Sequence, residues 1–383
     1  MATQPKYTAT LPAAAPEPEK RRRRRPLRAV LLVLLAVAVL VPASVGAYLY
    51  SLGQVFDSQS KTIESPFPAE STRPQPRSQA AVPEGGAGSA PGAGPATAET
   101  ADGGGSGGAG GSVNILVMGS DSRGATAGEA LSGGNSNQRA DTLMLVHIPA
   151  DRSKIFSISL MRDLWVGIPD HGQAKINAAL AYGGVPLMVQ TVESMFHQRI
   201  DHVAMIDFEG FVGMTDALGG VEVNITQPFV SPHSSKKFAK GPMVLNGEHA
   251  LDFVRERYAY ADGDYQRVRN QQAFVRALLA KNLSAETLLN PVKVHNVLSA
   301  MAPYISVDSG LDSATLARMA LELRDVRSGD MVMFTLPTLG TGTSADGQSI
   351  VLPDHNAIAG ISQALAGDSL DKFVANEGLA GGH

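Results

Sequence analysis

The sequence predicts an α/β protein: a single domain with a mixed central β-sheet flanked by helices on both faces, preceded by one transmembrane helix. Three observations support this prediction. An uncharged run occupies residues 29–50, a stretch rich in Pro, Gly and Ala follows it, and from residue 113 short apolar runs alternate with longer segments of helical spacing. Strands that alternate with helices are typical of a sheet covered on both faces.

The N-terminal part predicts a membrane anchor. Residues 1–28 form a basic tail, which the positive-inside rule assigns to the cytoplasm. Residues 29–50 can span a hydrocarbon core of ~30 Å at a rise of ~1.5 Å per residue. The run exceeds the apolar core of a cleaved signal peptide, so we favour an uncleaved anchor over that alternative. The chain is then a single-pass protein of the cell membrane, with a cytoplasmic N-terminus and an extracytoplasmic C-terminal domain.

Residues 51–111 are predicted to be a disordered Pro/Gly/Ala-rich tether, because such a composition buries too little apolar surface to offset its ordering entropy. A flexible coil of about 60 residues has an r.m.s. reach on the order of 40 Å. The sequence contains no cysteine, which excludes disulfides, thiol catalysis and cysteine metal sites.

The folded domain is expected at residues 112–365, with a loose C-terminal tail at 366–383. Asn246 is a suitable N-cap for a helix, and Gly183 and Gly184 should break another one. Apolar runs predict strands at 113–119, 142–148, 154–160, 202–206, 220–225 and 330–336. Helical spacing predicts helices at 176–196, 208–218, 247–258, 266–283, about 285–301 and 311–324.

Several common signatures of function are absent from the sequence. The segment 119–124 has the glycine spacing of a phosphate-binding loop but lacks its lysine, so no nucleotide is expected. Neither a nucleophile elbow nor a zinc-protease motif occurs, and the histidines lack metal-ligand spacing. Nucleic acid is a disfavoured partner, because the basic run abuts the membrane segment and its charge is explained by membrane orientation.

Arginine and aspartate gather at the ends of the predicted strands and in "RERYAYADGDYQRVRN", residues 255–270. An ordinary salt-bridged surface helix would look similar to this stretch. However, arginine keeps its proton and presents a planar fork of donors that suits phosphate, and the aspartates are too few to neutralise all of the arginines. We therefore expect an external phosphate ligand, and the same carboxylates could hold Mg²⁺. The strand-end pairs are Asp121 with Arg123, Arg139 with Asp141, and Arg162 with Asp163.

Eight motifs in order make the chain resemble the LytR-CpsA-Psr family of bacterial cell-envelope proteins. They cover about residues 113–285, and long Ala/Gly/Pro stretches suggest an actinobacterial source. The motifs are "GSDSR" (119–123), "RADT" (139–142), "SLMRDLWV" (159–166), "KINAALAYGG" (175–184), "DFEGF" (207–211), "DALGGVEV" (216–223), "LNGEHALDFVRERY" (245–258) and "DYQRVRNQQAF" (264–274).

The resemblance implies a phosphotransferase that moves a glycopolymer, such as a teichoic acid or a capsular polysaccharide, from a polyprenyl-pyrophosphate carrier onto peptidoglycan. Its partners would be that lipid-linked glycan, peptidoglycan and the cytoplasmic membrane, and Mg²⁺ or Mn²⁺ would be held by Asp121 and Asp141. The implied catalytic residues are Asp121, Arg123, Arg162, Arg255, Arg257 and Arg267. The implied substrate-binding residues are Arg139, Asp163, Lys175, Asn177, Asp264, Gln271 and Arg269.

Two departures from the family pattern concern this site. Met161 stands where the family usually has Pro, and Asn270 holds the final arginine position, with Arg269 one residue earlier. One residue is about 100° around a helix, so Arg269 is expected to turn away from the pocket. Two apolar segments, 185–196 and 273–283, are candidates for a lipid pocket, and ordinary core is the alternative for both. A non-catalytic protein that binds polyprenyl phosphates or wall polymer, and a polyprenyl-pyrophosphate hydrolase, remain alternative functions.

Overall fold

The computed structural model describes residues 53–54, 56–76, 111–121, 139–282 and 291–379. The chain separates into two units, Met1–Ser51 and Leu52–His383, and the second contains all of the described elements. The predicted cytoplasmic tail (1–28) and membrane helix (29–50) lie outside the described residues. Among the residues that are described, no helix has the length and apolar character needed to cross a membrane.

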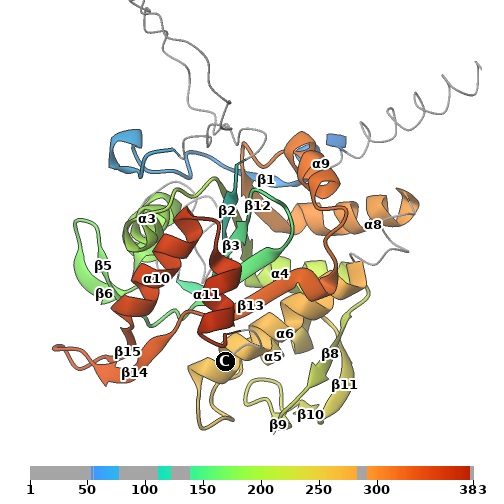
Figure 1. Cartoon of the computed structure of the whole chain (residues 1–383). Coiled ribbons are helices and arrows are strands. Elements are labelled where there is room, and N and C mark those ends of the chain that lie inside the picture. The colour runs from blue at the N-terminus through green and yellow to red at the C-terminus, as the bar shows by residue number, and fades with distance from the viewer. Residues whose placement is uncertain (1–52, 55, 77–110, 122–138, 283–290, 380–383) are drawn as a thin grey trace, which may run out of the picture. The chain divides into compact units, whose positions relative to one another are not determined.

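A mixed sheet of seven strands forms the centre of the described domain (Figure 1), as the sequence predicts. Three neighbouring pairs run parallel (β1 with β12, β7 with β2, β4 with β13), and the other three are antiparallel. Five of the six predicted strands are confirmed in this sheet. From edge to edge its strands are β1 (Lys61–Ile63), β12 (Ile305–Asp308), β7 (His202–Asp207), β2 (Val113–Ser120), β3 (Ala140–Ile148), β4 (Ile155–Leu160) and β13 (Met331–Thr335).

One face of the sheet is fully packed. Alternate strand residues such as Leu116 and Met118 point into the main core with α3 (Ala178–Phe196), α10 (His355–Ala366) and α11 (Leu370–Asn376). As predicted, α3 is broken at Gly183 and Gly184, where the backbone leaves the helical region. Gly184 has φ of 64° and ψ of −157°, a conformation that favours glycine.

The opposite face is covered by α4 (Phe208–Ala217), α5 (Gly247–Arg255) and α6 (Asp264–Asn282). Asn246 caps α5 as predicted, accepting a hydrogen bond from the His249 backbone at 3.0 Å. A second, smaller core joins α5 and α6 to β8 (Val221–Ile225), β9 (Phe229–Val230), β10 (Lys237–Phe238) and β11 (Gly241–Leu245). The predicted strand 220–225 therefore forms, but it pairs with β11 instead of joining the central sheet.

The remaining helices and strands lie around the sheet. The helices predicted at about 285–301 and 311–324 correspond to α8 (Pro291–Met301) and α9 (Ser313–Glu322), although residues 283–290 lie outside the described part. Three hairpins were not predicted: β9 with β10, β5 (Trp165–Ile168) with β6 (Gly172–Lys175), and β14 (Thr338–Thr343) with β15 (Ser349–Pro353). Short 3₁₀ turns occur at η1 (Glu70–Thr72), η2 (Ala302–Tyr304) and η3 (Ser328–Asp330).

Two predicted boundaries are wrong. The predicted tether begins too early, because Phe56 and Ile63 are buried and β1 belongs to the central sheet. The C-terminal tail is not loose as far as the structure describes it, since α11 buries Leu370 and Val374 in the main core. In both segments a few apolar residues, diluted among small and polar ones, anchor the chain.

Candidate functional site

A cavity of about 430 Å³ lies between the central sheet and the helices α4, α5 and α6. On the sheet side it is lined by the strand residues that alternate with the main-core residues, such as Val117, Gly119 and Ala204. The helices contribute mainly apolar side chains. These are Phe208, Phe211, Met214, Leu251, Val254, Phe274, Val275 and Leu278. An apolar enclosure of this size suits an extended hydrocarbon chain.

Two apolar segments, 185–196 and 273–283, were candidates for the lining of a lipid pocket, and one of them is confirmed as cavity lining. Residues from the segment 273–283 line the cavity. The segment 185–196 does not, because α3 packs on the opposite face of the sheet, where Met188 and Val192 are fully buried in the main core.

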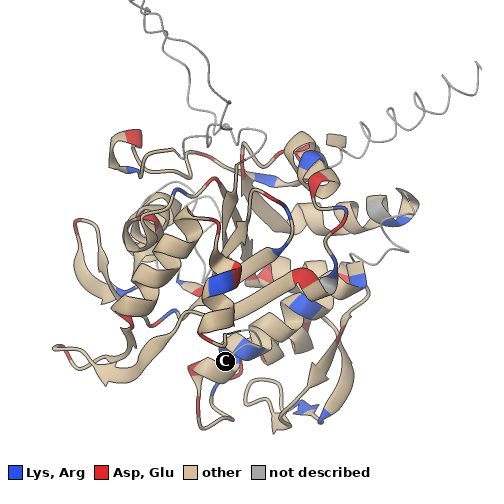
Figure 2. Ribbon diagram, in the orientation of Figure 1, with Lys and Arg blue, Asp and Glu red and all other residues tan. Residues whose placement is uncertain are grey.

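Charged residues gather at the same cavity, and they come from different parts of the chain. Arg162 follows β4, Arg255 ends α5, Arg257 lies in the segment after it, and Arg267 lies in the first turn of α6. Basic and acidic residues both occur along α5 and α6 (Figure 2). The cavity thus combines an apolar interior with a cluster of guanidinium groups.

A β-bulge turns Asp141 toward this cluster. Gly119 pairs with Thr142, but the next residue, Ser120, pairs with Ala140, so Asp141 is the extra residue on β3. A bulge of this kind re-aims a side chain beside a site. Asp141 lines the cavity and accepts a short hydrogen bond from Nη1 of Arg162.

Arg267 is the most deeply buried arginine of the cluster, with 3% of its surface exposed. Its Nη1 lies 3.1 Å from Oδ1 of Asp264. Burial lowers its pKa, and the neighbouring charge of Arg162 acts in the same direction. Within the described residues, the buried Nε atoms of Arg162 and Arg267 have no hydrogen-bond acceptor. Buried cationic donors without acceptors are costly, so this arrangement favours an anionic ligand.

A second layer of charges supports the arginines from outside the cavity lining. Lys175 Nζ lies 3.3 Å from Oδ1 of Asp163, and Arg257 Nη1 lies 3.5 Å from Oδ1 of Asp264. The two carboxyl groups hydrogen-bond to each other. Burial and this contact raise the pKa of Asp163. The pKa of Asp264 is lowered, because the charge of Arg267 and the hydrogen bond from Asp163 outweigh its burial.

Aromatic rings orient the other two arginines. The guanidinium carbon of Arg255 lies 4.4 Å from the ring centroid of Phe208. That of Arg257 lies 4.6 Å from the ring of Tyr258, whose hydroxyl also accepts a 2.7 Å hydrogen bond from Nη2. Neither Phe208 nor Tyr258 was predicted as a site residue, although their positions inside the motifs "DFEGF" and "LNGEHALDFVRERY" could have identified them.

Other predicted site residues have structural contacts. Gln271 lines the cavity and donates to the carbonyl of Val254 at 3.3 Å. Asn177 is buried, and its backbone N–H donates to the carbonyl of Arg162 at 3.2 Å. The turn that contains Arg162 and Asp163 forms with Met161 in place of Pro, since the Leu164 N–H donates to the Met161 carbonyl at 2.9 Å.

Arg269 lies apart from the cavity lining. It contacts Asp262, and its Nε donates to Oε1 of Gln266 at 2.9 Å. Asn270 is buried and donates to the carbonyl of Phe253 at 3.1 Å, so this position carries a packing role. The one-residue displacement of the arginine therefore directs its side chain elsewhere, in the way that helical geometry suggests.

Asp121 and Arg139 join the ends of β2 and β3. The Arg139 backbone N–H donates to Oδ1 of Asp121 at 2.8 Å, and the Asp121 N–H donates to the Arg139 carbonyl at 3.1 Å. Arg123 lies outside the described residues. In the part of the chain that is described, no three His, Asp or Glu residues are grouped to hold a metal. Asp121, directly after β2, and Asp141, on β3, are the two carboxylates predicted to bind Mg²⁺, which takes one or two carboxylates and completes its shell with phosphate oxygens and water.

Comparison with known proteins agrees with this geometry. The model of the LytR_cpsA_psr family matches residues 96–367. Cell wall biosynthesis protein LcpA of Corynebacterium glutamicum is 30% identical over 296 residues, which are 67% of this chain and 56% of LcpA. The teichoic acid transferase TagU of Enterococcus faecalis is 31% identical over 228 residues, or 59% of this chain and 72% of TagU. The match thus spans little more than half of LcpA, and likewise 54% of LcpB from the same organism.

Solved structures show the same fold. Bacillus subtilis TagV superposes with a TM-score of 0.57 at 24% identity, covering 68% of this chain and 98% of TagV. TagT bound to LI-WTA gives a TM-score of 0.53 at 25% identity, covering 67% of this chain and 90% of TagT. With the family model matching most of the described domain, the chain belongs to the LytR-CpsA-Psr family.

Proposed function

We propose that this protein is a membrane-anchored phosphotransferase that moves a glycopolymer from a polyprenyl-pyrophosphate carrier to peptidoglycan, forming a phosphodiester. The observation that carries the proposal is one cavity with an apolar interior and a cluster of four arginines. A ligand that matches both parts has a long hydrocarbon chain and a multiply charged phosphate group. The relatives named as teichoic acid transferases support the same reaction.

In the proposed reaction, a hydroxyl oxygen of a wall sugar attacks the phosphorus atom bonded to the donor sugar. The bond from that phosphorus to the bridging oxygen breaks, and polyprenyl phosphate leaves with the bond's electron pair. Arg162 and Arg267 would neutralise charge on the phosphates, and their Nε–H groups, which have no acceptor among the described residues, are suited to donate hydrogen bonds to phosphate oxygens. The proton of the attacking hydroxyl passes to a carboxylate, for which Asp121 and Asp141 are the candidates. The pyrophosphate bond supplies the driving force, so no nucleotide is needed.

We further propose Mg²⁺ (or Mn²⁺) as cofactor, with Asp121 and Asp141 as its carboxylate ligands. When bound, the cation supplies additional neutralisation of phosphate charge. The residues of the chain do the rest: the bulge at Asp141 aims its carboxylate, and the contact with Arg162 holds the guanidinium in place until the donor arrives.

Membrane anchoring belongs to the same proposal. A carrier with a polyprenyl chain resides in a lipid bilayer, and the uncharged run 29–50 would keep the domain at that bilayer with its N-terminus in the cytoplasm. The site would then act at the outer surface of the cell membrane.

The test uses the full chain in detergent, a short-chain polyprenyl-pyrophosphate glycan and peptidoglycan oligomers, with and without Mg²⁺, in ¹⁸O-labelled water. A fragment that begins at residue 112 is unsuitable because it lacks β1. Mass spectrometry of a Mg²⁺-dependent phosphodiester between glycan and wall sugar would establish the transferase.

Other outcomes select the alternatives. A free glycan phosphate that carries ¹⁸O identifies a hydrolase, because water has then attacked the phosphorus. A donor that binds but stays intact identifies a binding protein. Arg162→Ala should abolish turnover, whereas Arg324→Ala, at a side chain 66% exposed, is the matched control and should leave it unchanged.

A further inference from the structure

The segment Phe56–Arg73, here called the N-terminal arm, is built into the edge of the central sheet (Figure 1). Its strand β1 pairs in parallel with β12, with Lys61 opposite Ser306 and Ile63 opposite Asp308. Composition predicts a tether here, yet this part of the segment supplies a strand of the folded domain.

Apolar and polar contacts hold the arm in place. Phe56 packs with Ala302, Val307 and Leu311, and Ile63 is buried in the main core. The carboxylate of Asp57 accepts hydrogen bonds from the backbone N–H and the hydroxyl of Ser313, at 2.9 and 2.7 Å, beside the start of α9.

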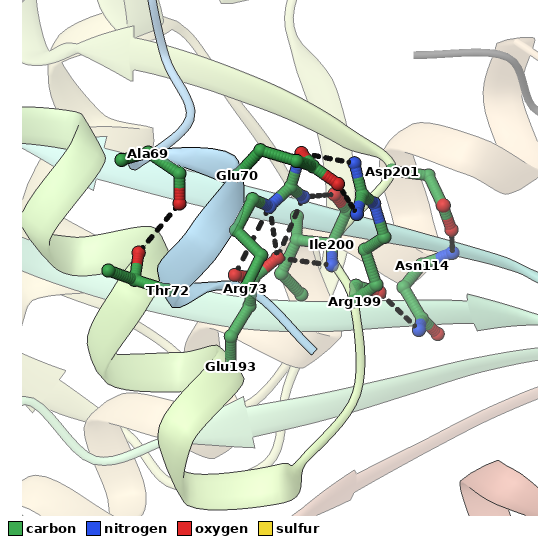
Figure 3. Close-up of polar contacts among 9 residues, drawn as sticks. All are labelled: Ala69, Glu70, Thr72, Arg73, Asn114, Glu193, Arg199, Ile200 and Asp201. Carbon is green, nitrogen blue, oxygen red and sulfur yellow. Dashed lines mark hydrogen bonds and ion pairs between the residues drawn. The ribbon is translucent and has the colours of Figure 1, made fainter. Parts of the chain in front are cut away.

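Arg73 closes the arm over the domain (Figure 3). Its Nη2 donates to Oε1 of Glu193 at 2.7 Å and to the carbonyl of Ile200 at 2.5 Å, and its guanidinium lies 4.4 Å from the ring of Phe67. The side chains of Arg73 and Glu193 are only 5% and 1% exposed. A carboxylate buried in α3 to this degree requires a paired cation, and the arm supplies it from 120 positions earlier in the chain.

A more exposed ion pair lies beside the buried one. Both terminal nitrogens of Arg199 contact the carboxylate of Glu70, one of them at 2.8 Å, and the hydrogen bond from Arg199 lowers the pKa of Glu70. The carbonyl of Arg199 accepts a 2.8 Å hydrogen bond from Asn114 on β2. The arm is thereby linked to the middle of the sheet (Figure 3).

We infer that the N-terminal arm is a constitutive part of the folded domain, so that the domain begins near Phe56 and not at residue 112. The inference rests on the proposed function only where it concerns the membrane. Phe56 lies six positions after Tyr50, the last residue of the predicted membrane helix. Six residues reach at most about 20 Å even when fully extended, against the r.m.s. reach on the order of 40 Å expected for a tether of about 60 residues. The link between the predicted membrane helix and the folded domain is thus much shorter than the predicted tether.

The experiment places a specific protease site in the glycine-rich stretch 103–108 of the full chain, in isolated membranes. After cleavage and sedimentation, we expect the fragment with the cavity to stay in the membrane pellet, because the arm still binds it. A tether predicts the opposite: the cleaved domain moves to the supernatant.

Variants of the arm sharpen the result. Arg73→Ala should release the domain after cleavage but not before it, and Glu70→Ala, which removes the exposed pair, should release less. Arg324→Ala is the control and should release none. Circular dichroism of the uncleaved Arg73→Ala chain checks that it is folded. If it is not, the fraction released by Glu70→Ala is compared with that of the wild type instead.

The two proposals can fail separately. If the uncleaved chain does not sediment with membranes, the anchor is refuted, and size-exclusion chromatography of the cleaved chain still tests the arm. Co-elution of the two fragments supports the inference, and separate elution under native conditions overturns it.

Discussion

The two faces of the central sheet use the same strands for different purposes. Along β2, Leu116 is fully buried against the helices of the main core, while Val117 and Gly119 line the cavity. A well-packed face contributes dispersion and apolar burial, whereas an unfilled one forgoes those contacts. One face thus stabilises the domain, and the other is left hollow for a ligand.

The buried charges of the domain differ in a similar way. On the packed side, Glu193 is matched by Arg73 and also accepts from the backbone N–H of Ile200 at 2.9 Å. At the cavity, Arg162 and Arg267 repel each other, and within the described residues their buried Nε atoms have no hydrogen-bond acceptor. The first arrangement is complete in the folded chain, and the second leaves donors for the anionic ligand that we propose.

The largest expected effect comes from the packed face. Phe334→Ala removes a fully buried ring from the main core and should lower the free energy of unfolding by about 3–5 kcal/mol. Denaturant unfolding measures this loss. Turnover per folded molecule should stay near the wild-type value, and a selective loss of turnover with unchanged stability would break the comparison between the faces.

Arg267→Met should reduce turnover without lowering stability. Losing one donor to the transferring phosphate is expected to reduce turnover by about 10²–10³-fold. The thermal midpoint should stay equal or rise, because burial and Arg162 already disfavour the charge of Arg267. Arg269→Met, outside the cavity lining, is the control and should retain turnover. A fall of several degrees in the variant's midpoint, with turnover preserved, would make Arg267 structural.

Replacing an aliphatic side chain by the larger phenylalanine should have unequal effects on the two faces of the sheet. Ile158→Phe overfills the main core and should cost about 1–3 kcal/mol of stability. Val275→Phe extends into the cavity and should barely alter stability, yet it displaces one or two methylenes of a bound chain, at about 0.8 kcal/mol each. Titration calorimetry should then show roughly tenfold weaker binding of a polyprenyl pyrophosphate. Equal stability losses for both variants would contradict a hollow face.

The smallest effect concerns pH. The folded pKa of Asp163 is raised, so its contribution to stability is present below its ordinary value of 3.8 and is lost as pH rises through the folded pKa. The pKa of Asp264 is lowered, so its contribution is lost only as pH falls below 3.8. Asp163→Asn stays neutral at every pH. Its thermal midpoint relative to the wild type should therefore increase as pH rises above 3.8, and a parallel pair of curves would refute the shift.

Sequence periodicity located five of the seven strands of the central sheet and the break in α3, because these depend on local patterns. Periodicity failed for the lining of the cavity. The segments 185–196 and 273–283 are both apolar and helical, and which of them lines the cavity depends on the face of the sheet that each helix covers. The site arginines were found from their residue type. The contact of Arg255 with Phe208 and the layer formed by Asp163 and Asp264 depend on segments that are distant in the sequence.

Short elements at the edges were missed for a different reason. β1 has three residues, of which only Ile63 is buried, so no period is visible in the sequence. The position of β1 depends on pairing with β12, which lies far along the chain, and on the contacts of Arg73, which is outside the strand. Composition averaged over residues 51–111 hid these anchors, because Gly, Ala and Pro make up 30 of those 61 residues.

We propose that the hollow face binds a molecule with both an apolar chain and a phosphate end. Calorimetry on the full chain compares the binding of three ligands: a short-chain polyprenyl pyrophosphate, inorganic pyrophosphate and the matching polyprenol. We expect tight binding of the first alone, weakened by Arg267→Met and by Val275→Phe. Binding of inorganic pyrophosphate or of the polyprenol as tight as that of the lipid pyrophosphate would contradict it.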